Sequence, residues 1–271
     1  MKGDAWTPTL KLDVGVHTDV GRARQRNEDA AKVSATPALL SVADGMGGHR
    51  GGDRASSIAV EALHEYIRQA HEQGVEPGED LLYEAFETAN VLILNDAARN
   101  PQFQGMGTTL TAMLFATHGT FLAHVGDSRA WRLRDGEPVQ ITHDHSLVAE
   151  QVREGSLTEE EARVHPSRHV LSRVLGFMPD VTFDTMTVYV QPDDTYVLAS
   201  DGLERGLDAD DIVRLVTAEA SAADAARSLV ETACERDGGD NITAIVVRCL
   251  ALESDTLTLE SDTLTLESDR V

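Results

Sequence analysis

Acidic residues stand where several apolar, strand-like segments of this chain stop, and glycine lies beside most of them. Examples are "SVADGMGG", "AHVGDS", "VLASDGL", "GGDNITAIVV" and "QRNEDA". If these strand ends converge, five or six carboxylates meet, and like charges in a low-dielectric setting repel strongly. A cluster of bound divalent cations is the natural remedy. The residues concerned are Glu28, Asp29, Asp44, Asp127, Asp201 and Asp240.

The stretch "ADGMGGHRGGD", residues 43–53, is the most concentrated of these segments. Ordering so much glycine is costly, because glycine loses more backbone freedom on folding than any other residue. An aspartate at a strand end suits a hard cation that prefers oxygen ligands, and Gly45 can add its carbonyl oxygen. A plain glycine-rich turn explains this stretch equally well when it is taken alone, whereas the phosphate-loop pattern GxxxxGK[ST] is absent.

The composition restricts the partners of the protein. The formal net charge is −23 and the isoelectric point is about 4.6, which argues against a nucleic-acid partner. We expect no membrane association, because no apolar run approaches the roughly 18 residues of a spanning helix and the N-terminus has no signal-peptide pattern. Cys234 and Cys249 are expected to be reduced thiols of a cytoplasmic protein.

The hydrophobic patterns predict an α+β fold. Strands are expected at 12–18, 38–44, 108–117, 120–127, 181–190, 194–201 and 242–250, with a further strand beside Glu28 and Asp29. Apolar residues at three- and four-residue spacing predict helices over 53–73 and 78–98, and two more near 208–218 and 221–236. This order favours antiparallel sheets that carry helices on their outer faces.

Three segments lie outside this pattern. Residues 1–11 are expected to be a loose leader before a single domain over 12–250. The polar stretch 143–180 is expected to be an inserted helical flap, in which Thr158 and Glu161 cap a surface helix over 156–163. The repeat "LESDTLT" in residues 251–271 predicts a disordered acidic tail, with a short coiled coil as the alternative.

Two divalent ions close together suit the hydrolysis of phosphoesters. The substrate phosphate then needs a cation outside the metal cluster, and Arg24 is the candidate for bidentate binding. Arg22 and Arg26 are close enough in sequence to compete for this role.

Eight motifs together resemble one family. "TDVGRARQRNEDA", "SVADGMGGHRGGDRAS", "GMGTTLTAML", "AHVGDSRAWRL", "ITHDHSLV", "HPSRHVLSRVLG", "LASDGL" and "GGDNITAIVV" follow the order seen in the metal-dependent protein phosphatases, the protein phosphatase 2C family. The chain resembles the compact bacterial form, over about residues 12–250.

The resemblance implies a four-layer α-β-β-α sandwich of two antiparallel sheets flanked by helix pairs. It implies hydrolysis of phosphoserine and phosphothreonine in proteins, by attack of a water that bridges two Mn²⁺ or Mg²⁺ ions. Asp44 would bridge the two ions and Gly45 would give its carbonyl to one of them. Asp201 and Asp240 would hold the other ion, and Arg24 would hold the substrate phosphate. The remaining implied roles are a weak third metal at Asp127 and indirect or water-mediated metal contacts from Glu28 and Asp29.

Two positions depart from the family pattern. Some relatives have a histidine directly after the "DG" as general acid, where this chain has Met46, with His49 nearby. Many relatives carry an acid four residues after the "SDG" aspartate, where this chain has Arg205 beside Glu204. The source of the leaving-group proton and the occupancy of the third metal site are therefore open.

The histidines of the flap, His143, His145, His165 and His169, are expected to be structural or solvated rather than a zinc site, and His17 and His124 to be core or edge residues of strands. The expected protein is a cytoplasmic monomer that acts on a protein phosphorylated by a serine/threonine kinase. A catalytically weak, phosphatase-like regulator that binds phosphoproteins is the alternative, and a phosphatase of small phosphometabolites is a third possibility.

Overall fold

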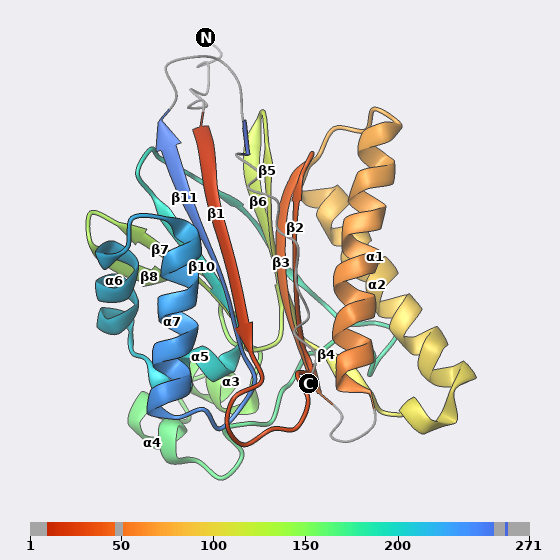
Figure 1. Ribbon diagram of the computed structural model, residues 1–271. Coiled ribbons are helices and arrows are strands. Elements are labelled where there is room, and N and C mark those ends of the chain that lie inside the picture. Colours follow the sequence, from red (N-terminus) through yellow and green to blue (C-terminus); the bar gives the residue numbers. More distant parts are fainter. Residues whose placement is uncertain (1–9, 47–50, 252–257, 260–271) are drawn as a thin grey trace.

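The computed structural model describes residues 10–46, 51–251 and 258–259. Two antiparallel sheets pack face to face, with a group of helices on the outer face of each (Figure 1). This is the expected α-β-β-α sandwich. The elements of the described ranges are the following.

The strands are β1 Leu10–Asp19, β2 Asp29–Ala35, β3 Ala38–Met46, β4 Gly107–Thr108, β5 Leu110–Ala116, β6 Gly119–Val125, β7 Arg129–Arg134, β8 Glu137–Gln140, β9 Asp184–Val188, β10 Thr195–Ala199, β11 Ile242–Ala251 and β12 Thr258–Leu259. The helices are α1 Gly52–Glu72, α2 Glu79–Arg99, the 3₁₀ helix η2 Pro101–Phe103, α3 Leu147–Arg153, α4 Glu159–Val164, α5 Asp201–Gly206, α6 Ala209–Ala218 and α7 Ala222–Arg236.

The strand order explains which elements meet. The first sheet runs β12-β1-β11-β10-β7-β8, and the second runs β2-β3-β5-β6-β9, with β4 added beside β3. Helices α5, α6 and α7 cover the first sheet, and α1 and α2 cover the second (Figure 1). The connections place the end of β3, the start of α5 and the start of β11 at one end of the sandwich.

Three apolar layers hold the sandwich together. The central layer lies between the sheets and contains fully buried residues such as Leu40, Tyr196 and Ile245. The two outer layers fill the space between each sheet and its helices, with Phe86 and Leu229 at their centres. Burial of a large apolar side chain contributes about 1.5–3 kcal/mol, and these layers fix the strand ends that carry the acids.

The helices expected at 53–73, 78–98, 208–218 and 221–236 are present, each with bounds within one or two residues of the expected ones. Strand β1 begins at Leu10, inside the segment expected to be a loose leader. The sequence analysis missed β7, β8 and α5, which are short and partly polar.

The flap contains α3 and α4, and the rest of residues 143–180 is mostly irregular. The predicted cap of the surface helix is confirmed, because Thr158 accepts from the Glu161 backbone N–H and Glu161 accepts from that of Thr158. In the repeat tail, β12 pairs in parallel with β1, which differs from the expected disorder at these two residues. The remainder of the tail lies outside the described residues.

Candidate functional site

The acids of the strand ends converge on one cavity of about 360 Å³, at the end of the sandwich where α5 and β4 lie. Asp44 and Asp127 come from the second sheet, and Asp201 and Asp240 come from the first. The loop between β1 and β2 contributes Arg24 and Glu28. The described lining is Arg24, Glu28, Asp44, Gly45, Met46, Thr109, Asp127, His169, Leu171, Asp201, Arg205, Asp240 and Asn241.

Backbone contacts hold Asp44 from three sides. Its N–H donates to Oγ1 of Thr109 at 2.8 Å, and its C=O accepts from Thr109 N–H and from Oγ1 of Thr108, each at 2.9 Å. The antiparallel register sets Asp44 opposite Asp29. The backbone position of Asp44 is therefore fixed by β2, by β4 and by Thr109, which directly precedes β5.

Within "ADGMGGHRGGD", Gly45 is required because neighbouring backbone atoms leave no room for a side chain. A Cβ atom at Gly45 would overlap the carbonyl oxygens of Gly52 and Glu28. The end of β3, the start of α1 and the loop before β2 thus touch through their backbones. This close approach explains part of the glycine density, while residues 47–50, including His49, lie outside the described residues.

Asp29 lies behind the cavity lining rather than in it. Its Oδ2 accepts from Ser200 Oγ and Thr243 Oγ1, each at 2.7 Å, whereas its buried Oδ1 has no hydrogen-bond partner. Burial raises the pKa of Asp29 from 3.8 to about 7, and the negative charges of Asp201 and Asp240 add to this rise.

Mutual repulsion dominates the electrostatics of the cavity. Burial raises the pKa of Asp44 well above its ordinary value, and the carboxylates of Asp29, Asp201, Asp127 and Asp240 raise it further. Burial also raises the pKa of Asp127 to about 8, with Asp201 as the next cause. A positive charge placed between these groups would reverse these shifts.

Arg24 supplies one such charge at the rim. Its Nη2 donates to Oδ2 of Asp240 at 2.8 Å, and Nη1 of Arg205 lies 3.6 Å from the same oxygen. Arg22 instead donates to the carbonyl of Glu235, and neither Arg22 nor Arg26 lines the cavity. Of the three neighbouring arginines, Arg24 is the one that reaches the site.

Asn241 is a residue that the sequence analysis missed. Its side-chain N–H groups donate to the carbonyls of Val20 and Arg26, each at 2.9 Å, and its Oδ1 accepts from Glu28 N–H at 2.8 Å. The side chain thereby ties the loop that carries Arg24 and Glu28 to the start of β11. Its place directly after Asp240, in "GGDNITAIVV", is the signal that could have identified it.

The residues fit a hard cation in their chemistry, because every anionic group that lines the cavity is a carboxylate and a buried carboxylate oxygen of Asp29 behind the lining has no hydrogen-bond partner. They do not form a ready-made cage: in the part of the chain that the structure describes, no three His, Cys, Asp or Glu side chains are grouped so that they could hold a metal ion. Binding therefore requires side-chain adjustment, with the ion pair between Arg24 and Asp240 as the contact to be exchanged.

The positions that depart from the family pattern have clear surroundings. Met46 and Arg205 line the cavity, whereas Glu204 pairs with Arg129 and accepts from Trp131 Nε1 at 2.7 Å. Glu204 therefore points away from the site and does not replace the acid missing at Arg205.

The histidines are divided between two settings. His124 and His145 are fully buried and hydrogen-bonded, as expected for structural residues. His169 lines the cavity, although a structural or solvated role was predicted for it. The sequence does not show this position, because only the fold brings this part of the flap next to the site.

Comparison with known proteins identifies the family. The sequence matches the family model described as Protein phosphatase 2C over residues 18–234. It is 40% identical to "Serine/threonine protein phosphatase PstP" of Mycobacterium tuberculosis, over 88% of this chain and 45% of that protein. It is 36% identical to "Serine/threonine phosphatase stp" of Listeria monocytogenes, over 85% of this chain and 93% of that protein.

Solved structures agree with this match. The PPM Ser-Thr phosphatase MsPP of Mycobacterium smegmatis superposes with a TM-score of 0.78 at 36% identity, covering 89% of this chain and 99% of that one. The catalytic domain of PstP in complex with two manganese ions superposes with a TM-score of 0.76 at 36% identity, covering 89% of this chain and 100% of that one.

This chain belongs to the protein phosphatase 2C family. The sequence-based prediction of family and fold is confirmed. The chain spans about half the length of the mycobacterial protein PstP that it matches.

The raised pKa of Asp29 predicts a stability that depends on pH. The folded state keeps a proton on Asp29 that the unfolded state releases above about pH 4. The contribution of Asp29 to the free energy of unfolding is therefore fully present below pH 3.8, and it is lost as pH rises through about 7. We expect Asp29→Asn, in EDTA, to be more stable than the wild type at pH 8 by up to about 4 kcal/mol, and equal to it below pH 4. Urea unfolding across this range measures the difference, and a difference that does not change with pH would contradict the assignment.

Proposed function

We propose that this protein is a metal-dependent phosphatase that hydrolyses phosphoserine and phosphothreonine in proteins. The observation that carries the proposal is the convergence of Asp44, Asp127, Asp201 and Asp240 on one cavity that also contains Arg24. A cluster of carboxylates suits divalent cations, and a guanidinium beside it suits a phosphate group. Membership of the protein phosphatase 2C family and the two manganese ions bound by the related PstP domain support the same reading.

Two Mn²⁺ or Mg²⁺ ions would be held by Asp44, the carbonyl of Gly45, Asp201 and Asp240. Asp127 would take part in a third, weaker site, while Glu28 at the lining and Asp29 behind it would act indirectly. The bound cations would supply positive charge that polarises a phosphoryl oxygen and makes water a better nucleophile near neutral pH. The same charge would hold the buried carboxylates in their ionised forms, against the repulsion that raises their pKa values.

Arg24 would bind the substrate phosphate. The guanidinium is about half exposed and reaches the cavity from the rim, so a phosphate can contact it without a change of the main chain. Its planar donors match two phosphate oxygens, and its release from Asp240 frees that carboxylate for a cation. Met46 has no proton to give, so protonation of the leaving hydroxyl must fall to another group.

The proposed setting is a monomer in the cytoplasm that reverses a serine/threonine kinase. Both cysteines are free thiols, which fits this compartment. Within the described residues, the helices are too short or too polar to cross a bilayer. The relatives named as serine/threonine phosphatases support a phosphoprotein substrate.

Asp44→Asn tests the metal-centred mechanism. We expect MnCl₂-dependent hydrolysis of p-nitrophenyl phosphate and of a phosphothreonine peptide by the wild type, and a loss of about 10²–10³-fold or more in the variant, because the central negative ligand is removed. Asp210→Asn, which changes an exposed acid in α6, serves as the matched control and should retain full activity.

Three other results of these assays would point to a different function or a different metal site. Binding of the phosphopeptide without turnover at any metal concentration would favour the phosphoprotein-binding regulator. Turnover of sugar phosphates in strong preference to the peptide would favour a phosphatase of small metabolites. Activity that survives Asp44→Asn would show that the metal centre lies elsewhere.

Arg24→Ala tests the phosphate contact. Loss of a charge-assisted hydrogen bond costs about 1.5–3 kcal/mol, so we expect kcat/KM for the phosphopeptide to fall about 10–150-fold, mostly through KM. Arg24→Lys should recover only part of this loss, because an ammonium cannot contact two oxygens in the same planar manner. Steady-state kinetics with Arg26→Ala as the control measures the effect, and equal losses at both arginines would contradict the assignment.

A further inference from the structure

A buried histidine of the flap contacts the turn that carries Asp127. The backbone N–H of His145 donates to the carbonyl of Gly126 at 2.7 Å, and Gly126 N–H donates to Nδ1 of the His145 ring at 3.2 Å. The imidazole has no exposed surface. Both the backbone N–H and the backbone C=O of Gly126 are thus bonded to a single residue of the flap.

Gly126 has little freedom to move away from this contact. Its φ of +109° lies in the region that favours glycine, and a Cβ atom there would overlap the side chain of Thr109. On the other side of the turn, Ser128 Oγ lies 2.7 Å from Oγ1 of Thr109, the same oxygen that accepts from Asp44 N–H. Both neighbours of Asp127 are therefore anchored, Ser128 to Thr109 and Gly126 to His145 of the flap.

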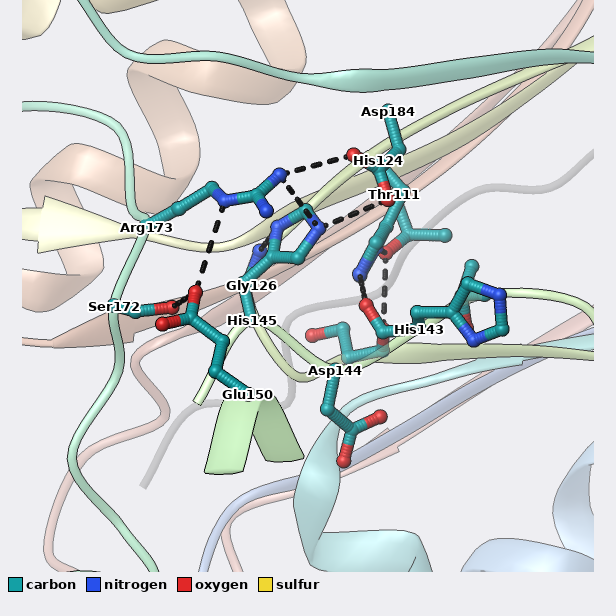
Figure 2. A network of polar contacts seen from close by, with 12 residues as sticks. Thr111, His124, Gly126, His143, Asp144, His145, Glu150, Ser172, Arg173 and Asp184 are labelled. Carbon is teal, nitrogen blue, oxygen red and sulfur yellow. Dashed lines mark hydrogen bonds and ion pairs between the residues drawn. The ribbon is translucent and has the colours of Figure 1, made fainter. Parts of the chain in front are cut away.

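The other ring nitrogen of His145 faces the flap network (Figure 2). Nε2 lies 3.1 Å from Oδ2 of Asp184, and Oδ1 of Asp184 accepts from Nη1 of Arg173 at 3.0 Å. Ser172 N–H donates to the carbonyl of His145 at 2.8 Å, and Ser172 Oγ donates to Glu150 at 2.5 Å. The network joins both ends of the flap, through Glu150 and Arg173, to β9.

These partners determine which nitrogen of the His145 ring carries the proton. Since Nδ1 accepts from Gly126, the proton of a neutral imidazole is on Nε2, where it donates to Asp184. The ring then links the backbone amide of Gly126 on one side to the carboxylate of Asp184 on the other, where Nη1 of Arg173 also lies 3.3 Å from Nε2. Such outer partners orient ligands elsewhere in metal proteins, and their loss typically costs 10–100-fold in metal affinity.

We propose that His145 is a positioning residue that connects the flap to Asp127 and sets the affinity of the Asp127 cation site. The inference rests on the proposed function, since it needs a divalent cation at Asp127. Because coupling is reciprocal, a contact on the flap that shifts the His145 ring would alter cation binding at Asp127.

Two substitutions separate the two sides of the ring. In His145→Asn the side-chain oxygen lies near the place of Nδ1 and can still accept from Gly126, whereas in His145→Gln the amide reaches toward Asp184 and the Gly126 acceptor is lost. A general structural role of the buried imidazole would be damaged in both variants. A positioning role through Gly126 would be damaged mainly in the glutamine variant.

Isothermal titration of the full chain with MnCl₂ is the test. Asp127→Asn identifies the binding component that depends on Asp127. We expect His145→Gln to weaken that component about 10–100-fold and His145→Asn to change it less than about 3-fold, with the other components retained in both. His64→Gln is the matched control, because His64 is also buried but is bonded to Ser34 and Ser41, and it should leave the component unchanged.

Equal weakening by both variants of His145, no weakening by either, or weakening of every component alike would overturn the inference. If Asp127→Asn removes no component, the inference also fails. If the wild type binds no Mn²⁺ at all, the proposed function fails together with it, which distinguishes the two cases. Should the His145 variants not fold, as judged by circular dichroism, Asp184→Asn takes the place of His145→Asn, since that side chain is only partly buried and the acceptor for Gly126 N–H is kept; weakening of the Asp127 component by more than about 3-fold would then overturn the proposal.

Discussion

Repulsion between buried carboxylates is the constraint on which the rest of this structure depends. Asp44 stands opposite Asp29 across β2 and β3, and Asp201 and Asp240 approach from the other sheet. Carboxylates this close together repel one another and would be more stable apart in water, so the packing of the fold must hold them together. The two sheets do this through their packed apolar faces, and the glycine contacts at Gly45 allow the backbones to meet.

The hydrogen bonds around the site follow the same logic. Thr108 and Thr109 fix the peptide groups of Asp44, Asn241 fixes the loop of Arg24, and His145 fixes the peptide of Gly126. Asp44 and Asp127 are thus held through their own or a neighbouring backbone group, and both line the cavity. Preorganisation of this kind is what a site for hard cations and phosphate requires.

The sequence predicted those parts of the fold that rest on local patterns. The long helices α1 and α2 have apolar residues at regular spacing, and the acids at strand ends marked Asp44, Asp127, Asp201 and Asp240 as a group before any strand was paired. The hairpin of β7 and β8 was missed because its strands are short and carry charge, although the Asp135-Gly136 pair, with both φ values positive, is a usual hairpin signal.

Contacts between distant segments could not be read from the sequence. The pairing of Arg24 with Asp240, the position of Asp29 behind the lining and the return of His169 to the cavity each join residues that are far apart in the chain. Hydrophobic periodicity predicts which face of a helix or strand is buried, but it does not predict how deeply a particular side chain lies within a site. The departure at Arg205 is an example, because only the structure shows that Glu204 beside it is paired with Arg129.

We propose that the converging acids form a divalent-metal centre around Asp44. Anomalous diffraction at the manganese edge, from crystals grown in MnCl₂, tests it most directly. We expect strong peaks in the cavity, in contact with oxygens of Asp44, Asp201 and Asp240. Manganese peaks elsewhere in the crystal, with none at Asp44, would contradict it.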